Sequence, residues 1–220
     1  MARVIAIDGP SGSGKSSTSR RVGRALGFLH VDSGALYRIM TWQCLAQGVE
    51  TSDPAAVAAC AERVQVECRP ENGALAYYVD GEAPGARIRT PEINAHASPV
   101  ATVKAVRDRI TALLRGMTRY GDLVVEGRDI TTVVFPDSPA RFYLTASPEA
   151  RARRRQLEEV ATGVANQSAE AVKASLLARD AIDSTRAYAP LRKADGVLEI
   201  DSTQLTLDQV VETPGTFPRD

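Results

Sequence analysis

A glycine-rich stretch with one lysine follows an apolar run near the start of the chain. Gly9, Gly14, Lys15 and Ser16 in GPSGSGKSS fit the spacing G-x-x-x-x-G-K-[ST], between a predicted strand and a predicted helix. Glycines let backbone amides turn toward a phosphate chain, and a helix N-terminus favours anions. Lys15 can then reach the β- and γ-phosphates, and the Ser16 hydroxyl can bind Mg²⁺. The stretch predicts a nucleoside-triphosphate site; the alternative is a Gly/Ser-rich surface turn.

Two further polar motifs follow apolar runs. DSGALYR at 32–38 follows the run at 28–31, and EGRDI at 126–130 ends the run at 123–126. Ligands of open α/β sheets bind at the carboxyl edge of the strands, so these motifs are candidates for a second anion site. The candidate residues are Ser33, Tyr37, Arg38 and Arg128, with carboxylates at Glu126 and Asp129. The competing interpretations are a helix cap at 32–34 and a surface salt bridge at Arg128.

Two later segments concentrate arginines on predicted helix faces. In SPEARARRRQLEE, Arg151, Arg154 and Arg155 share one face, which beside a phosphate loop is typical of a lid closing on triphosphate charge. In ARDAIDSTRAYAPL, Arg179 and Arg186 flank Asp183 at helical spacing. Solvated helix faces with exposed ion pairs are the alternative for both segments.

Short apolar runs alternate with helical patterns and predict an α/β core. We expect strands at 3–7, 28–31, 123–126, 141–146 and 197–201, and helices at 15–26, 34–47, 100–117, 149–160 and 169–185. Most of the runs lack polar alternation, as in a parallel sheet covered on both faces. RVQVECR and ALAYYVD do alternate, with turn signals ENG and DG, and predict a small inserted antiparallel sheet. The tail TPGTFPRD predicts a loose terminus.

Composition argues against several classes of function. The 220 residues carry 27 Lys and Arg against 27 Asp and Glu, so a broad nucleic-acid or membrane surface is not expected. Three cysteines without a C-x-x-C pair predict reduced thiols in the cytosol, and the two histidines have no metal-ligand spacing. No apolar run approaches the ~20 residues of a membrane span, and no signal peptide is visible. We therefore expect a cytoplasmic protein.

In combination, the motifs resemble those of one family, the bacterial cytidylate kinases, which are nucleoside monophosphate kinases of the P-loop class. The resemblance runs from IDGPSGSGKSS through DSGALYR and EGRDITTVVFPD to RDAIDSTRAYAPL, almost the whole chain. The first motif is shared with many ATPases; the later ones together are highly specific. The resemblance implies a P-loop kinase core with a five-stranded parallel sheet at 1–50, 118–146 and 187–220. It also implies a monophosphate-binding domain at 51–117, which contains the small antiparallel sheet, and a short lid at 147–186.

The resemblance also implies an activity and its residues. The chain would transfer the γ-phosphoryl group of ATP to CMP or dCMP with Mg²⁺, as a cytoplasmic monomer that binds neither nucleic acid nor membrane. The implied ATP-binding residues are Gly9, Ser11, Gly12, Ser13, Gly14, Lys15, Ser16, Ser17, Arg151, Arg153 and Arg154. The implied substrate-binding residues are Ser33, Tyr37, Arg38, Ser98, Arg107, Arg128, Asp129, Arg179, Asp183 and Arg186. Lys15, Arg128 and Arg186 would be catalytic, and Ser16 would bind the metal.

Within the substrate-binding set, the resemblance divides the roles. Arg38, Arg128 and Arg186 would hold the acceptor phosphate. Arg179 and Asp183 would contact the ribose, and the cytosine would be read by three residues, Ser98, Arg107 and Asp129.

One departure from the family pattern lies beside the implied base site. Thr131 stands where the pattern GRD-x-GT has glycine, so the backbone after Asp129 is expected to differ. Two other functions remain open. One is a small P-loop kinase for UMP, AMP or shikimate, which the base and ribose residues would distinguish. The other is a noncatalytic protein gated by ATP, which would need no second anion site.

Overall fold

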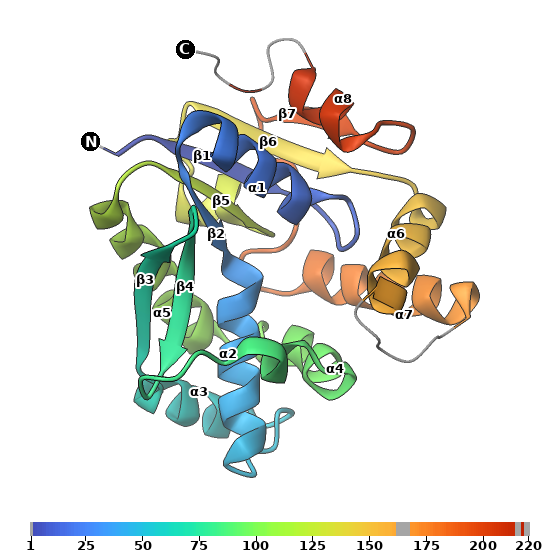
Figure 1. Ribbon diagram of the computed structural model, residues 1–220. Coiled ribbons are helices and arrows are strands. Elements are labelled where there is room, and N and C mark those ends of the chain that lie inside the picture. The colour runs from blue at the N-terminus through green and yellow to red at the C-terminus, as the bar shows by residue number, and fades with distance from the viewer. Residues whose placement is uncertain (1, 162–167, 214–216, 218–220) are drawn as a thin grey trace.

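Five parallel strands form the centre of the protein. The computed structural model describes residues 2–161, 168–213 and 217. Strands β1 (Val4–Asp8), β2 (Leu29–Asp32), β5 (Leu123–Gly127), β6 (Ala140–Thr145) and β7 (Leu198–Asp201) lie in the order β2-β5-β1-β6-β7, all parallel. The predicted α/β class and five-stranded parallel core are confirmed (Figure 1). Their carboxyl ends therefore share one edge of the sheet.

The inserted hairpin extends this sheet instead of forming a separate one. Strands β3 (Val66–Glu71) and β4 (Ala74–Val79) pair antiparallel, and a single bridge, His30 to Ala74, joins β4 to β2. Seven strands thus form one mixed sheet. The ENG signal becomes a tight turn in which Asn72 (φ 49°) and Gly73 (φ 76°) are both left-handed. The predicted alternation places the side chains of Leu75, Tyr77 and Val79 in the core.

Apolar side chains cover both faces of the central sheet. On one face, Ile5 and Ile7 of β1 pack with Val22 of α1 (Lys15–Leu26) and Val210 of α8 (Leu207–Glu212). On the other face, Ala6 packs with residues of α2 (Ser33–Ala46), α3 (Pro54–Arg63) and α5 (Lys104–Gly116). This two-sided burial is why the strands read as continuous apolar runs.

The predicted helix at 100–117 corresponds to α5, and a separate helix precedes it. The structure has α4 (Pro91–Val100), a turn, and then α5, which a short η2 (Met117–Tyr120) follows. The Thr102 hydroxyl donates to the Pro99 carbonyl at 2.7 Å, and its amide donates to the same oxygen at 3.0 Å, which ends α4. Helices α3 and α4 and the short η1 (Gly85–Arg89) were not predicted, although the Asp53 cap before Pro54 is a start signal for α3.

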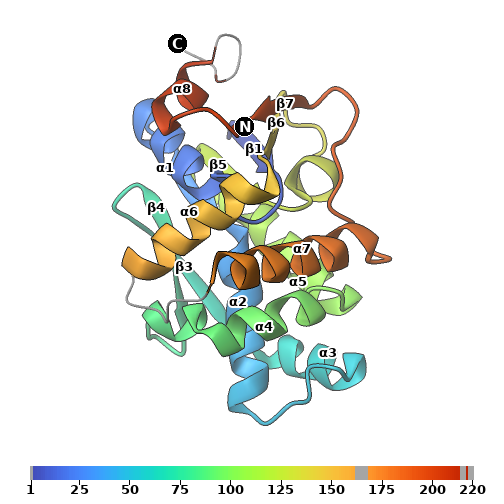
Figure 2. The ribbon, with the colours of Figure 1, turned by 90° about the vertical axis from the view of Figure 1, so that its right-hand side faces the viewer.

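Two neighbouring helices project beyond the carboxyl edge of the sheet. Helices α6 (Pro148–Ala161) and α7 (Ala169–Thr185) lie side by side, with a small core of Ala152, Val172 and Leu176 between them (Figure 2). They occupy the segment predicted as a lid, of which 162–167 lie outside the described residues. Of the tail predicted to be loose, only Thr213 and Phe217 are described. No helix within the described ranges has the length and apolar character needed to cross a bilayer.

Candidate active site

A polar cleft of about 370 Å³ lies where the strands end. Gly9 follows β1, Ser33 follows β2, and Arg128 follows β5, so three loops meet at one edge of the sheet. The cleft is lined by most of the predicted residues: Ser11, Gly12, Gly14, Lys15, Ser16, Ser17, Ser33, Tyr37, Arg38, Ser98, Arg107, Arg128, Asp129, Arg154, Arg179, Asp183 and Arg186. Gly9, Ser13, Arg151 and Arg153 do not line it. Seventeen positions scattered from 11 to 186 are thus brought to one cavity.

The phosphate loop begins at Gly9 and ends where α1 starts at Lys15. Gly14, at φ 95°, adopts a left-handed conformation at the helix N-cap. The Lys15 ammonium is buried and donates to the Pro10 carbonyl at 2.7 Å. Burial, and then the nearby Arg128, lower the pKa of Lys15 to about 7. A phosphate placed in the loop would supply the negative charge that this ammonium lacks.

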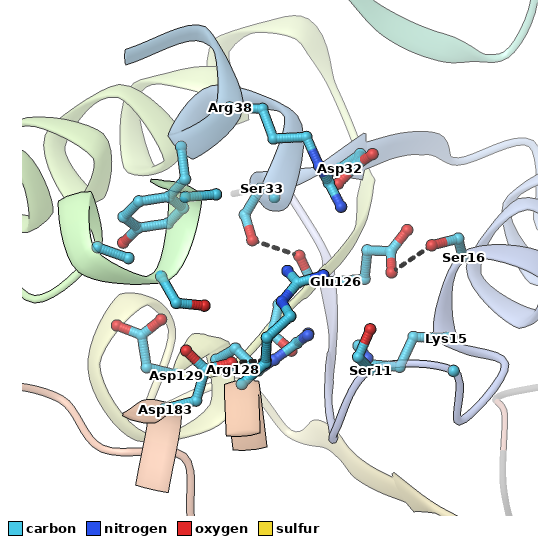
Figure 3. A pocket seen from close by; sticks show the side chains of 18 of the residues that line it. Ser11, Lys15, Ser16, Asp32, Ser33, Arg38, Glu126, Arg128, Asp129 and Asp183 are labelled. Carbon is cyan, nitrogen blue, oxygen red and sulfur yellow. Dashed lines mark hydrogen bonds and ion pairs between the residues drawn. The ribbon is translucent and has the colours of Figure 1, made fainter. Parts of the chain in front are cut away.

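A hydroxyl and a carboxylate meet just beyond the loop. Ser16 Oγ donates to Glu126 Oε2 at 2.8 Å (Figure 3). His30 Nε2 lies 3.0 Å from Glu126 Oε1. Ser33 Oγ donates to the backbone oxygen of Glu126 at 2.6 Å, which ties β5 to the start of α2. Two oxygen donors beside a phosphate loop are the set that Mg²⁺ uses when it is bound together with nucleotide phosphates.

Four predicted arginines converge on the middle of the cleft. Arg128 Nε lies 3.0 Å from Asp183 Oδ2, and Arg186 Nη1 lies 3.3 Å from Asp183 Oδ1. In the view of Figure 3, Arg128 lies between Asp183 and the phosphate loop. Burial, followed by the charges of Arg128 and Arg38, lowers the pKa of Arg179 to about 10.

These cations repel one another. Burial also lowers the pKa of Arg38, which faces the charges of Arg89, Arg128 and Arg155 as well as Asp32. The Arg179 Nε is buried and has no hydrogen-bond partner within the described part of the chain. Like charges gathered in a partly dehydrated cleft favour a bound polyanion such as a phosphate group.

The far end of the cleft holds an arginine–carboxylate pair. Arg107 Nη2 lies 2.5 Å from Asp129 Oδ2, and both side chains are about 4 % exposed. The Arg107 guanidinium lies 5.2 Å from the Tyr37 ring centre, and Ser98 is buried nearby on the cleft wall. Arg107 Nη1 donates to the Ala101 carbonyl at 3.0 Å, while the buried Arg107 Nε has no hydrogen-bond partner among the described residues. Buried polar atoms left without such bonds are suited to a planar polar ligand.

The predicted lid arginines lie in different places. Arg154 lines the cleft, and its Nη1 and Nη2 donate to Ser202 Oγ at 2.9 Å and to Ser202 O at 2.6 Å. Arg151 is buried against the loop, donating to the Ser11 carbonyl at 3.1 Å and pairing with Asp180. Arg153 is exposed. Arg151 therefore joins α6 and α7 to the phosphate loop, while Arg154 faces the cavity.

Five charged residues of the cleft were outside the predicted site: Asp32, Arg89, Glu126, Arg155 and Glu158. Arg155 of α6 forms ion pairs with Glu158 and Glu159, and Glu126 is a carboxylate near the end of β5. Asp32 caps α2 through the Ala35 amide, and Arg89 of η1 lies 3.2 Å from it. Arg89 carried no sequence signal, because η1 brings it to the cleft from a segment with no regular pattern.

Comparison with known proteins places the whole chain in one group. A family model described as cytidylate kinase matches residues 5–214. The chain is 46% identical over 213 residues to a cytidylate kinase of Streptomyces avermitilis, covering 96% of this chain and 90% of the relative. It is 40% identical over 209 residues to a cytidylate kinase of Shouchella clausii, covering 95% and 92%.

One of the solved structures that match the chain resembles it in fold. An uncharacterized protein from Eubacterium ventriosum has a TM-score of 0.50 at 11% identity, covering 95% of this chain and 93% of that one. A putative kinase from Chloroflexus aurantiacus has a TM-score of 0.46 at 13% identity, covering 99% of each chain.

Proposed function

The chain belongs to the cytidylate kinase family, and on that premise we propose how its cleft serves the reaction. The enzyme is an ATP-dependent kinase that converts CMP or dCMP into CDP or dCDP and leaves ADP. The observation that carries the residue assignment is the two-ended cleft. A phosphate loop occupies one end, the Arg107–Asp129 pair occupies the other, and arginines lie between them.

The transfer needs positioning more than covalent chemistry from the protein. An oxygen of the acceptor phosphate is already anionic and attacks the γ-phosphorus in line. The bond from that phosphorus to the bridging oxygen breaks, and its electrons leave with ADP. No general base is required. The protein must hold two anions at reacting distance and exclude water, which would otherwise accept the phosphoryl group.

We assign the donor end to residues 9–17. Backbone amides of the loop and the N-terminus of α1 hold the β-phosphate, and Lys15 turns from the Pro10 carbonyl to the β- and γ-oxygens. Gly9 and Ser13 do not line the cleft, so we assign them to the conformation of the loop and not to direct contact with the nucleotide. Arg154 contributes charge from α6, while Arg151 holds α6 against the loop.

We assign the acceptor phosphate to Arg38, Arg128 and Arg186. Guanidinium groups bind phosphate oxygens in pairs and stay charged at neutral pH. Asp183 holds Arg128 and Arg186 by one oxygen each, and it lies at the cleft wall beside Arg179, where a ribose hydroxyl could also bind. These arginines weigh against a protein that uses ATP only as a switch, because such a protein needs no second anion site.

The donor set beside the loop fits Mg²⁺. The Ser16 hydroxyl and the Glu126 carboxylate would hold the ion, directly or through water, in company with ATP oxygens. When bound, the ion neutralises charge on the β- and γ-phosphates. The His30 ring beside Glu126 Oε1 fixes the orientation of that carboxylate. We further propose that the enzyme acts as a monomer in the cytoplasm, consistent with its three free thiols.

The base end predicts strong preference for CMP over UMP. A carboxylate at Asp129 suits the amino group of cytosine, and Arg107 suits its N3 and O2 acceptors. Uracil would place O4 against the carboxylate and N3–H against the guanidinium. Two mismatched buried contacts at ~1–3 kcal/mol each predict a ratio of kcat/KM of about a hundredfold or more. A coupled ADP assay with CMP, dCMP, UMP and AMP measures it.

Arg107→Ala should lower that ratio at least tenfold, because it removes one of the two readers. Lys104→Ala is the matched control, since Lys104 lies on the same helix but pairs with Asp108 at the surface. A wild-type ratio near one would show that Arg107 and Asp129 do not read the base. A second acceptor such as UMP used equally well would favour the broader P-loop kinase assignment.

A further inference from the structure

A buried carboxylate at the end of β1 has no part in the reaction as assigned above. Asp8 is fully buried, does not line the cleft, and immediately precedes Gly9 of the phosphate loop. Burial raises the pKa of Asp8 to about 6, against the opposing effect of bonds from Thr131. An ionised carboxylate at this buried position lowers the stability of the fold unless hydrogen-bond donors replace the lost water. The residues that donate to Asp8 therefore explain why a carboxylate lies there.

Those partners are the two residues that follow Asp129. The Ile130 amide donates to Asp8 Oδ1 at 2.9 Å, and the Thr131 amide donates to Asp8 Oδ2 at 2.7 Å. On the other side of the turn, the Asp129 carbonyl accepts from the amides of Val133 and Val134 at 2.9 and 3.1 Å. The backbone that carries Asp129 is therefore fixed at both its ends.

A third bond comes from a side chain that departs from the family pattern. Thr131 Oγ1 donates to Asp8 Oδ2 at 2.6 Å, and Thr131 is fully buried. A glycine here, as in the pattern GRD-x-GT, would offer only its amide. The backbone after Asp129 forms one bulged helical turn, Ile130–Val134, and the Thr131 hydroxyl adds a further bond from this turn to Asp8.

The anchor joins the two ends of the active site. Asp8 is bonded to the turn that presents Asp129, and along the chain it is the residue next to Gly9. The Asp129 carboxylate in turn lies 2.5 Å from Arg107 Nη2, so a small shift of the turn would alter both base-reading groups. A hydrogen bond to an ionised acceptor is stronger than one between neutral groups, so it helps to hold such a turn in one position.

We propose that Thr131 is a positioning residue for base selectivity, whose hydroxyl, through Asp8, sets the Asp129 carboxylate against the substrate base. The inference rests on the proposed role of Asp129 and extends it to a residue that never touches the substrate. Thr131 acts on discrimination between bases, not on the phosphoryl donor, because it lies in the turn that follows Asp129 and does not line the cleft.

Thr131→Val tests this, since it removes the hydroxyl and keeps both backbone bonds to Asp8. We expect KM for CMP to rise about tenfold and the CMP-to-UMP ratio of kcat/KM to fall about tenfold, with KM for ATP within twofold of wild type. Thr131→Ser keeps the hydroxyl and should restore the ratio to within about twofold. A merely structural role would lower the melting temperature and leave the ratio unchanged.

Thr132→Val is the matched control. The Thr132 hydroxyl is also buried, but it has no hydrogen-bond partner among the described residues. Its loss should therefore leave the CMP-to-UMP ratio of kcat/KM unchanged. A folded Thr131→Val enzyme with the wild-type ratio would overturn the inference, as would an equal effect of Thr132→Val. If wild-type enzyme shows no preference for CMP, the proposed role of Asp129 fails first, which separates the two outcomes.

Discussion

The ammonium group of Lys15 is poised to change its charge when a nucleotide binds. Its pKa is lowered to about 7 by burial and by Arg128, against 10.5 in an unfolded chain. Below pH 7 both states are charged, and the full cost of burial opposes folding. Between about pH 7 and 10.5 the folded chain releases the proton first, so stability rises with pH in this window. Bound phosphates should raise the pKa again.

Binding of ATP at pH 8.5 should therefore take up roughly one proton, since the free enzyme is mostly uncharged at Lys15 and the complex is charged. Calorimetric titration with metal-free ATP in buffers of different ionisation enthalpy measures this uptake. Lys15→Arg is the control, because a guanidinium stays protonated and should give none. Equal uptake in both enzymes, or none in wild type, would contradict the assignment of Lys15 to the phosphates.

The junction of β1, the phosphate loop and β6 leaves no room for a side chain at Gly9. Gly9 has φ of 151°, and a Cβ there would lie 2.0 Å from the Leu144 carbonyl oxygen in β6. Gly48, after α2, has φ of 67° but nothing within 4 Å of such a Cβ. Substituting each glycine therefore separates two costs: backbone strain, which both positions share, and steric overlap with β6, which only Gly9 has.

Gly9→Ala should lower the melting temperature substantially more than Gly48→Ala. Strain alone costs about 1 kcal/mol, whereas the overlap at Gly9 must displace a strand carbonyl and should bring the cost above ~2 kcal/mol. In a chain of this size that is a fall of about 5 °C or more, against about 2–4 °C for the control. Thermal unfolding of both variants measures the two melting temperatures. Similar falls in melting temperature would mean that the loop moves away from β6 at little cost.

Charge is balanced over the whole molecule but not within the cleft. The net charge is zero, yet Arg38, Arg128, Arg179 and Arg186 gather at one cavity, where Asp183 pairs with Arg128 and Arg186. The lowered pKa of Arg179 shows that folding disfavours its charged form. At neutral pH the arginine remains charged, so the empty enzyme bears a cost that bound phosphate relieves.

Arg179→Gln should make the empty enzyme more stable and less active. Removing one cation from the cluster should raise the melting temperature by about 2–4 °C at low salt, the shift that ~1 kcal/mol gives at this size. The value of kcat/KM for CMP should fall at least tenfold. Scanning calorimetry without ligand measures the first effect and the coupled assay the second.

Arg20→Gln is the control for net charge, because Arg20 is exposed on α1. It should change neither quantity. A fall in melting temperature for Arg179→Gln would mean that Arg179 supports the fold and is not held there for an anion.

The sequence by itself determined the local chemistry and most of the elements. Apolar runs without polar alternation predicted the five parallel strands, because strands of a sheet that is buried on both faces carry apolar side chains on both sides. The spacing around Lys15 predicted the phosphate loop, since a glycine-rich turn with a lysine between a strand and a helix is the arrangement that binds nucleotide phosphates. Motifs at strand ends predicted which side chains meet, because parallel strands end at one edge.

Only the tertiary structure decided which atoms are partners. The arrival of Arg89 at the cleft and the turn of Arg151 toward Asp180 depend on contacts between distant segments. Thr131 is the clearest case: in the sequence it is a departure from a pattern, and in the structure its hydroxyl reaches a carboxylate 123 residues away. Periodicity and motif spacing report the chain's local preferences, whereas such bonds arise when packing removes water and leaves each buried polar group to find a partner.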